Sequence, residues 1–128
     1  MVVLDTNVII DHLRLQEASK ESSLMKLARE KPKETLAISI LSVQELYEGK
    51  STMDTQKEQY MLATISPLKI LPYTYEVAKL AGELARDLGR PIELADAGIA
   101  ATAILNGGKL CTANTKDLVG IEKLQLVS

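Results

Sequence analysis

Short apolar runs that alternate with helical patterns are the feature that most constrains how this chain folds. The first run, residues 1–4, stops at Asp5, and a helical pattern with Ile9, Ile10 and Leu13 on its apolar side follows. Further apolar runs occur at residues 36–41, 68–71, 109–112 and 124–127. Short buried strands that alternate with helices form parallel sheets with helices on both faces. We therefore predict an α/β fold, a three-layer α/β/α sandwich around a parallel sheet of four to five strands.

The predicted helices lie between residues that favour helix starts and stops. Asn7 is the expected N-cap of the first helix. Two more helices are predicted at residues 22–29 and at about residues 54–65. The clearest periodicity follows Pro72, where apolar residues recur at helical spacing until Gly89, which is a favourable helix stop. An alanine-rich helix is predicted after residue 91, and its small side chains permit close packing on a sheet.

Length and composition are those of an ordinary globular domain, and they exclude several classes of protein. The chain has 128 residues, 46% of them hydrophobic and 25% charged, so we expect a single domain over residues 1–128. One cysteine, Cys111, and one histidine, His12, are too few for a disulfide scaffold or a structural zinc site. No apolar run approaches the ~20 residues that a membrane span needs, and no signal peptide is recognisable. We therefore expect a cytoplasmic protein.

Four acidic residues lie at the predicted junctions between strands and helices: Asp5, Glu45, Asp96 and Asp117. In a parallel sheet the carboxyl ends of the strands meet at one edge, where ligands bind. Each acid alone has a structural explanation, because the helix dipole favours carboxylates in a first turn. Ser42 and Glu45 also have the spacing of a capping box, with Ser42 opening its helix. Together, however, the four acids predict a common site.

Four carboxylates at one edge would repel one another. Two unit charges ~4 Å apart cost roughly 4 kcal/mol at an effective dielectric constant of 20. Either some of the carboxyl groups stay protonated or cations lie among them. Oxygen ligands select hard cations, which favours Mg²⁺ or Mn²⁺ over zinc. The formal net charge is −2, and without these four acids it would be slightly positive.

Four segments of the chain carry a resemblance to a known family: Val3–Asn7, Ser42–Gly49, Leu94–Ala103 and Thr112–Leu118. The chain resembles the PIN-domain superfamily, and within it the VapC-type toxin ribonucleases. The segments occur in the family's order, with its approximate spacing and total length. The resemblance therefore covers nearly the whole chain and implies a PIN-like version of the predicted sandwich.

The resemblance implies hydrolysis of RNA phosphodiester bonds by a metal-activated water. The four acids, here called the acidic quartet, would be the catalytic residues and would bind Mg²⁺, or Mn²⁺ in its place. We expect Asp5 and Asp96 to be the central metal ligands, and the resemblance gives Thr112 and Asn114 supporting hydrogen bonds. Glu93 is an additional acid near Asp96. It is either an exposed glutamate at a helix start or a participant in the site.

The partners that the resemblance implies are an RNA substrate, a VapB-like antitoxin and a second copy of the chain in a homodimer. The antitoxin's tail would cover the acidic cleft, often with an arginine among the carboxylates, because a guanidinium replaces the cation's charge and binds carboxylates bidentately. Two positions depart from the family pattern. Ala113 stands where arginine is common, and Leu118 replaces a common phenylalanine.

Four other functions are alternatives to this one. Two of them also involve RNA. One is a non-toxin PIN-domain nuclease in RNA processing or decay, and the other is a non-catalytic RNA-binding relic. A relic has no need to keep four mutually repelling acids. A phosphatase of the haloacid dehalogenase type needs a second aspartate where this chain has Asn7. A receiver domain needs an acid at the end of a mid-chain strand, where this chain has Leu71 and Pro72.

Three other side chains have specific expectations. His12 is predicted to be solvated on a helix surface. Cys111 is predicted to be a small buried apolar group within a strand. Tyr47 lies two residues after Glu45, so its ring either stacks on RNA or packs in the core.

Overall fold

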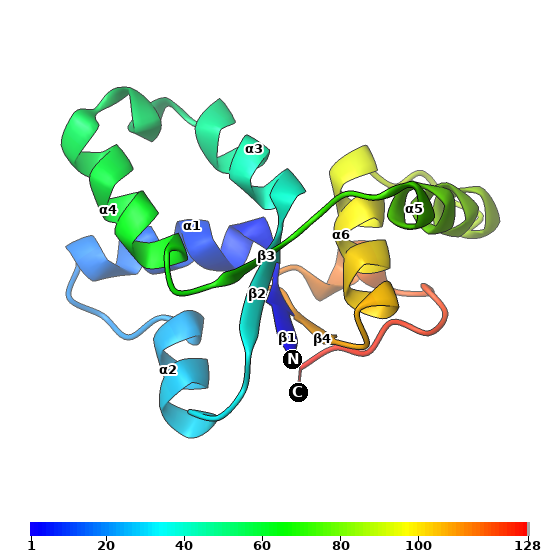
Figure 1. Cartoon of the computed structure of the whole chain (residues 1–128), viewed down its shortest axis with the longest axis horizontal. Coiled ribbons are helices and arrows are strands. Elements are labelled where there is room, and N and C mark those ends of the chain that lie inside the picture. The colour runs from blue at the N-terminus through cyan, green and yellow to red at the C-terminus, as the bar shows by residue number, and fades with distance from the viewer. Residues whose placement is uncertain (128) are drawn as a thin grey trace.

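A four-stranded parallel sheet in the order β3–β2–β1–β4 forms the middle layer of the molecule. The computed structural model describes residues 1–127, so Ser128, the last residue of the predicted domain, lies outside the described part. The strands are β1 (Val2–Leu4), β2 (Leu36–Ser39), β3 (Lys69–Leu71) and β4 (Lys109–Cys111). Helices lie on both sides of the sheet (Figure 1), so the predicted α/β/α sandwich is confirmed.

Six α-helices and two short 3-10 helices connect the strands in the described residues. The α-helices are α1 (Thr6–Glu17), α2 (Ser23–Glu30), α3 (Ile40–Glu48), α4 (Thr55–Ile65), α5 (Tyr75–Asp87) and α6 (Leu94–Leu105). The 3-10 helices are η1 (Lys50–Met53) and η2 (Thr115–Leu118). The first four helices connect β1, β2 and β3, and α5 and α6 connect β3 back to β4. Among the described residues 1–127, no helix is both long and apolar enough to cross a membrane.

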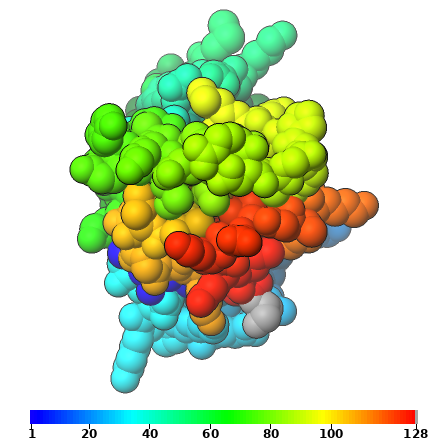
Figure 2. Space-filling view, turned by 90° about the vertical axis from the view of Figure 1, so that its right-hand side faces the viewer, coloured from blue at the N-terminus to red at the C-terminus, as the bar shows by residue number. Residues whose placement is uncertain are grey.

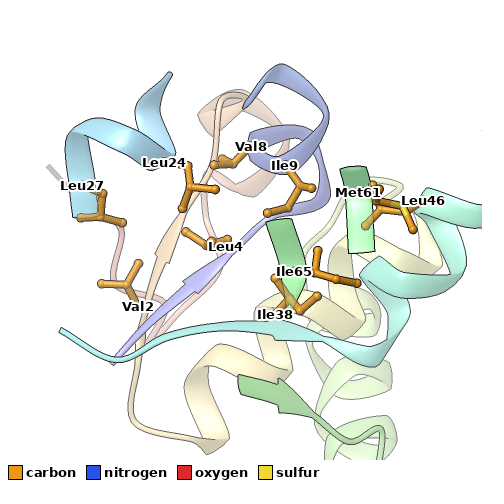
Figure 3. Close-up of a cluster of buried hydrophobic side chains, with 10 residues drawn as sticks. All are labelled: Val2, Leu4, Val8, Ile9, Leu24, Leu27, Ile38, Leu46, Met61 and Ile65. Atoms are coloured by element: carbon orange, nitrogen blue, oxygen red, sulfur yellow. The ribbon is translucent and has the colours of Figure 1, made fainter. Parts of the chain in front are cut away.

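Alternate residues of β1 point to opposite faces of the sheet and build two separate cores. Val2 and Leu4 pack with Ile38 against α1, α2, α3 and α4 (Figure 3). Val3 and Ala37 lie in the second core, against α6. Strands buried on both faces carry continuous apolar sequence, which is why residues 1–4 and 36–38 contain no charge.

The second face of the sheet is covered by tightly packed small residues. Ala100 and Ala103 of α6 are fully buried in this core. A Cβ at Gly98 would overlap the side chain of Leu41 and crowd that of Tyr73, so a larger residue here would force these side chains to move and glycine favours the close approach of α6 to α3. Figure 2 shows α5 and the C-terminal segment after β4 side by side on the outside of this face. The close approach places the first turn of α6 near the carboxyl edge of the sheet.

Two predicted helix starts are wrong by a few residues. The N-cap of α1 is Asp5, whose side chain accepts from the N–H of Thr6, and not Asn7. The N-cap of α3 is Ser39, so Ser42 lies inside the helix and the predicted capping box does not form. Asp, Asn and Ser are all favourable N-caps, and sequence alone did not decide among neighbouring ones.

The fifth predicted strand, residues 124–127, is reduced to one isolated parallel bridge between Leu126 and Leu110. The N–H of Leu110 donates to the carbonyl of Gln125 at 2.8 Å, and the N–H of Val127 donates to the carbonyl of Leu110 at 2.9 Å. Gly120 and Lys123 adopt positive φ just before this segment. These turns bring the chain onto the edge of β4 for too few residues to form a strand.

We expect Ile38→Ala to destabilise the protein much more than Ile70→Ala. The two residues are partners in register on β2 and β3, but Ile38 is fully buried and Ile70 is 46% exposed. Truncating the buried side chain should cost about 2–5 kcal/mol, and truncating the half-exposed one should cost less than about 1.5 kcal/mol. Urea unfolding measures both changes. Equal losses would contradict the placement of the core.

Candidate active site

The candidate site lies where β1 and β4 end side by side and the chain leaves them toward opposite faces. After β1, α1 packs into the core of one face through Val8 and Ile9. After β4, η2 packs into the core of the other face through Leu118. Such a switch point leaves a crevice at the carboxyl edge of a parallel sheet, where ligands bind.

Asp5 directly follows β1 at this switch point and is only 8% exposed. Its Oδ1 accepts a 2.8 Å hydrogen bond from the N–H of Thr6, and its Oδ2 accepts one of 2.8 Å from the hydroxyl of Thr112. The backbone N–H of Asp5 also donates to the carbonyl of Cys111 at 2.9 Å. Burial raises the pKa of Asp5, and the bonds from Thr112 and Thr6 partly offset that rise. Asp5 is therefore held rigidly by both strands.

The segment after β4 supports the site with further hydrogen bonds. The Nδ2 of Asn114 donates to Oδ2 of Asp117 at 2.5 Å, so Asn114 lies beside this acid. Asn7 was not predicted to take part. Its Nδ2 donates to the Thr112 hydroxyl at 3.4 Å, and its Oδ1 accepts from the N–H of Ala113 at 3.2 Å. Asn7 lies in Val3–Asn7, the first of the four segments that resemble the family. This position was the sequence signal that could have identified it as a site residue.

Glu45 reaches the site from the second turn of α3. Its Oε1 lies 2.6 Å from the hydroxyl of Thr6, the first residue of α1. That hydroxyl also lies 2.8 Å from the hydroxyl of Ser42, one turn before Glu45. Thr6 and Ser42 are buried, and sequence reasoning assigned neither to the site. Their contact depends on how α1 packs against α3, which no residue pattern within one helix reports.

Asp96 shows most directly that the acids share one place. It is half-buried in the first turn of α6, and its pKa is raised to about 6. Burial is the largest cause, and the negative charges of Asp5, Glu93, Asp117 and Glu45 add to it in that order. The structure thus brings the other three members of the acidic quartet, and Glu93 with them, within electrostatic reach of Asp96.

The acids surround the site without converging on one point. A depression of about 120 Å³ is lined by Asp96, Asp117, Glu93 and Arg90. Arg90 turns its guanidinium to the backbone, donating to the carbonyls of Asp117 and Val119 at 3.1 and 2.6 Å. Glu93 is exposed at the N-cap of α6 and makes no capping hydrogen bond. Within residues 1–127, no three His, Cys, Asp or Glu side chains form a compact ligand group.

The structure departs in part from the specific predictions made for three side chains. The prediction for His12 is wrong, because the ring is half-buried and its Nδ1 lies 2.6 Å from the hydroxyl of Ser22, the N-cap of α2. Burial lowers the pKa of His12. Cys111 is half-buried in β4, and burial raises the pKa of its thiol. Tyr47 is 44% exposed, so its ring is not part of the core, and stacking on RNA stays a prediction.

The sequence profile of the PIN domain matches residues 2–123, nearly the whole chain. The chain belongs to the PIN-domain family. Among curated relatives, the "VapC ribonuclease Y4jK" of Sinorhizobium fredii is 29% identical over 126 residues, covering 90% of this chain and 88% of that protein. The "Plasmid stability protein StbB" of Pseudomonas syringae pv. tomato is 31% identical over the same shares. The predicted family is thereby confirmed.

Solved structures agree with this PIN-domain assignment. The structure of VapBC2 from Rickettsia felis, bound to a DNA fragment from its promoter, superposes with a TM-score of 0.80 at 30% identity, covering 99% of this chain and 98% of that one. A toxin–antitoxin complex from Klebsiella pneumoniae gives a TM-score of 0.75 at 29% identity, covering 100% and 97%. The α/β fold of this chain therefore matches that of PIN-domain VapC structures.

We expect Asp96→Asn to stabilise this PIN domain in the absence of divalent cations. The folded pKa of about 6 lies above the ordinary 3.8, so the folded state holds the extra proton and loses stability as pH rises through that window. After a discount for its partial exposure, removing the charge at pH 7.5 should raise the unfolding free energy by about 1 kcal/mol, or about 3–5 °C in Tm.

Thermal unfolding in EDTA at pH 7.5 and pH 4.5 measures this gain, which should shrink at the lower pH. Asp87→Asn is the matched control, since Asp87 is exposed on α5 and paired with Arg86. Removing that acid should give no gain. A gain for Asp96→Asn of the same size at both pH values would contradict a charge-repulsion origin.

Proposed function

We propose that this PIN domain, comprising residues 1–128, is a metal-dependent endoribonuclease and the toxin of a VapBC-like toxin–antitoxin pair in the cytoplasm. The observation that carries the proposal is the gathering of four strand- and helix-end acids at one edge, where burial and then the charges of the other acids raise the pKa of Asp96 to about 6. A cluster of mutually repelling carboxylates around the buried Asp5 costs folding stability, and function is the usual reason to keep it. The resemblance to a VapC ribonuclease supplies the reaction class.

The donor set fits a hard divalent cation. Every candidate ligand is a carboxylate oxygen, and in the described residues no thiol or imidazole lies among the groups that raise the pKa of Asp96. Asp5 and Asp96 would be the central ligands of Mg²⁺ or Mn²⁺, with Glu45 and Asp117 binding directly or through water. Because the acids do not form a compact group, waters would complete the coordination, as is usual for Mg²⁺.

When bound, the cation would supply Lewis-acid stabilisation of a phosphate and activation of water. The chain's own residues hold the acids in place for that chemistry. Thr112 and the N–H of Thr6 fix both oxygens of Asp5, and Asn114 fixes one oxygen of Asp117. His12 contacts Ser22 and takes no part, so proton transfer would depend on carboxylates and water.

We further propose a VapB-like antitoxin as inhibitor and a homodimer as the assembled toxin. The relative structures from Rickettsia felis and Klebsiella pneumoniae are toxin–antitoxin complexes, which supports the first partner. A groove with a volume of about 710 Å³ is lined by residues of α1, α3, η1 and α4, with Ile10, Leu13 and Met61 as apolar lining residues and Glu45 among its acids. It would offer an antitoxin apolar surface that continues to the acidic quartet.

Purified, antitoxin-free protein should cleave RNA with Mg²⁺ or Mn²⁺ and not with EDTA. We expect Asp5→Asn to lower the rate at least about 100-fold, because even hydrogen-bond partners of metal ligands are worth 10–100-fold. Gel analysis of total cellular RNA, followed by mapping of the cut ends, measures cleavage and its target.

Asp87→Asn, purified in parallel, controls for the loss of an acid outside the site and should retain full activity. Cleavage that survives both EDTA and Asp5→Asn would identify a contaminating nuclease. Folded wild-type protein that binds neither cation and cuts no RNA would favour the alternative, a non-catalytic RNA-binding relic. Cleavage of RNA precursors without harm to cells on expression would favour a processing nuclease over a toxin.

A further inference from the structure

Thr6 hydrogen-bonds two members of the acidic quartet that come from different elements. Its backbone N–H donates to Oδ1 of Asp5 at 2.8 Å, at the end of β1. Its side-chain hydroxyl lies 2.6 Å from Oε1 of Glu45, on α3. Thr6 is 6% exposed, so these bonds are shielded from water. One residue therefore fixes the spacing between the first strand's acid and the third helix's acid.

The direction of each bond follows from the number of hydrogens available. A hydroxyl has one hydrogen, and an ionised carboxylate only accepts, so Thr6 donates to Glu45. The remaining contact at 2.8 Å then has the hydroxyl of Ser42 as donor and that of Thr6 as acceptor. A separation of 2.6 Å is typical of a charge-assisted O–H···O⁻ bond. The result is a buried relay from Ser42 through Thr6 to Glu45.

Glu45 needs such a bond more than the other acids do. Its long side chain extends from a helix toward carboxylates of the same charge, and its own charge adds to the rise in the pKa of Asp96. Repulsion and side-chain entropy both favour a Glu45 carboxylate that swings out to water. Within the described residues, the hydroxyl of Thr6 is the hydrogen-bond donor that this carboxylate has.

We propose that Thr6 is a positioning residue, which holds the Glu45 carboxylate beside Asp5 and thereby sets the affinity of the acidic quartet for a divalent cation. This inference rests on the proposed metal-dependent nuclease. Thr6 is not one of the four acids, but its hydroxyl would hold the Glu45 carboxylate in place against the repulsion of the other three. Hydrogen-bond partners of this kind are worth 10–100-fold in metal affinity.

Thr6→Val and Thr6→Ser separate the hydroxyl from the shape of the side chain. Valine keeps the branched shape and the backbone N–H but removes the donor to Glu45, whereas serine keeps the donor and loses a methyl group. We expect Thr6→Val to weaken Mn²⁺ binding about tenfold and Thr6→Ser to bind within about twofold of wild type. Calorimetry of Mn²⁺ binding, with Mn²⁺ electron paramagnetic resonance, measures affinity independently of RNA cleavage.

A double-mutant cycle tests whether Thr6 acts through Glu45. If it does, Thr6→Val in a Glu45→Gln background should change Mn²⁺ affinity by less than about twofold, because the charged acceptor is already gone. A full tenfold loss in that background would overturn the proposal. So would equal affinities of Thr6→Val and wild type, or equal losses in Thr6→Val and Thr6→Ser.

Ser42→Ala provides the test if Thr6→Val does not fold by circular dichroism. It removes the donor behind Thr6 and leaves the Thr6–Glu45 bond itself, so we expect a loss of about two- to threefold through weaker cooperativity. An unchanged Mn²⁺ affinity in Ser42→Ala would overturn the proposed role of the hydrogen bonds from Ser42 through Thr6 to Glu45. Wild-type protein that binds no Mn²⁺ would instead overturn the proposed function, and this inference with it. Wild-type binding with an unaffected Thr6→Val would overturn the inference alone.

Discussion

The burial of Asp5 between the ends of β1 and β4 is the constraint on which the rest of the site depends. A carboxylate that is 8% exposed is stable only if its oxygens have donors, and both oxygens have one. Those donors tie Asp5, the residue that follows the central strand β1, to the first turn of α1 and to the segment after β4. Asp117 and Asn114 lie within five residues of Thr112, so the geometry of Asp5 also fixes where they lie.

The same arrangement lowers the stability of the fold at the proposed functional site. The two cores of the sandwich supply the stabilising free energy, and the carboxyl edge loses part of it through like charges. Asp96, with a pKa raised to about 6, carries the clearest sign of this loss. Hydroxyl and amide groups at the edge hold the acids in an unfavourable arrangement, and a bound cation would relieve the repulsion. In the proposed metal-dependent nuclease, the acids would therefore be held in place before a cation binds.

Much of the fold followed from patterns within short segments. The four strands and six helices were predicted, because buried runs such as residues 36–41 and the periodicity after Pro72 are local signals. The starts of α1 and α3 were predicted a few residues away from their actual N-caps, Asp5 and Ser39, because neighbouring polar residues are equally favourable N-caps. Contacts between helices were invisible: neither the Thr6–Glu45 bond nor the burial of His12 against Ser22 has a signal in the sequence. The acids were predicted by position, but the residues that orient them were only partly found.

The pairing of β1 with β4 has a consequence for protein synthesis. Translation proceeds from the N-terminus, so Asp5 is made more than a hundred residues before Thr112 and Asp117, its partners at the carboxyl edge. Until β4 is available, β1 has an unpaired edge and Asp5 lacks one of its two donors. A nascent chain on the ribosome therefore has no assembled acidic edge. The nuclease proposed above would therefore stay inactive beside the ribosome's own RNA until residues 109–117 have emerged and docked.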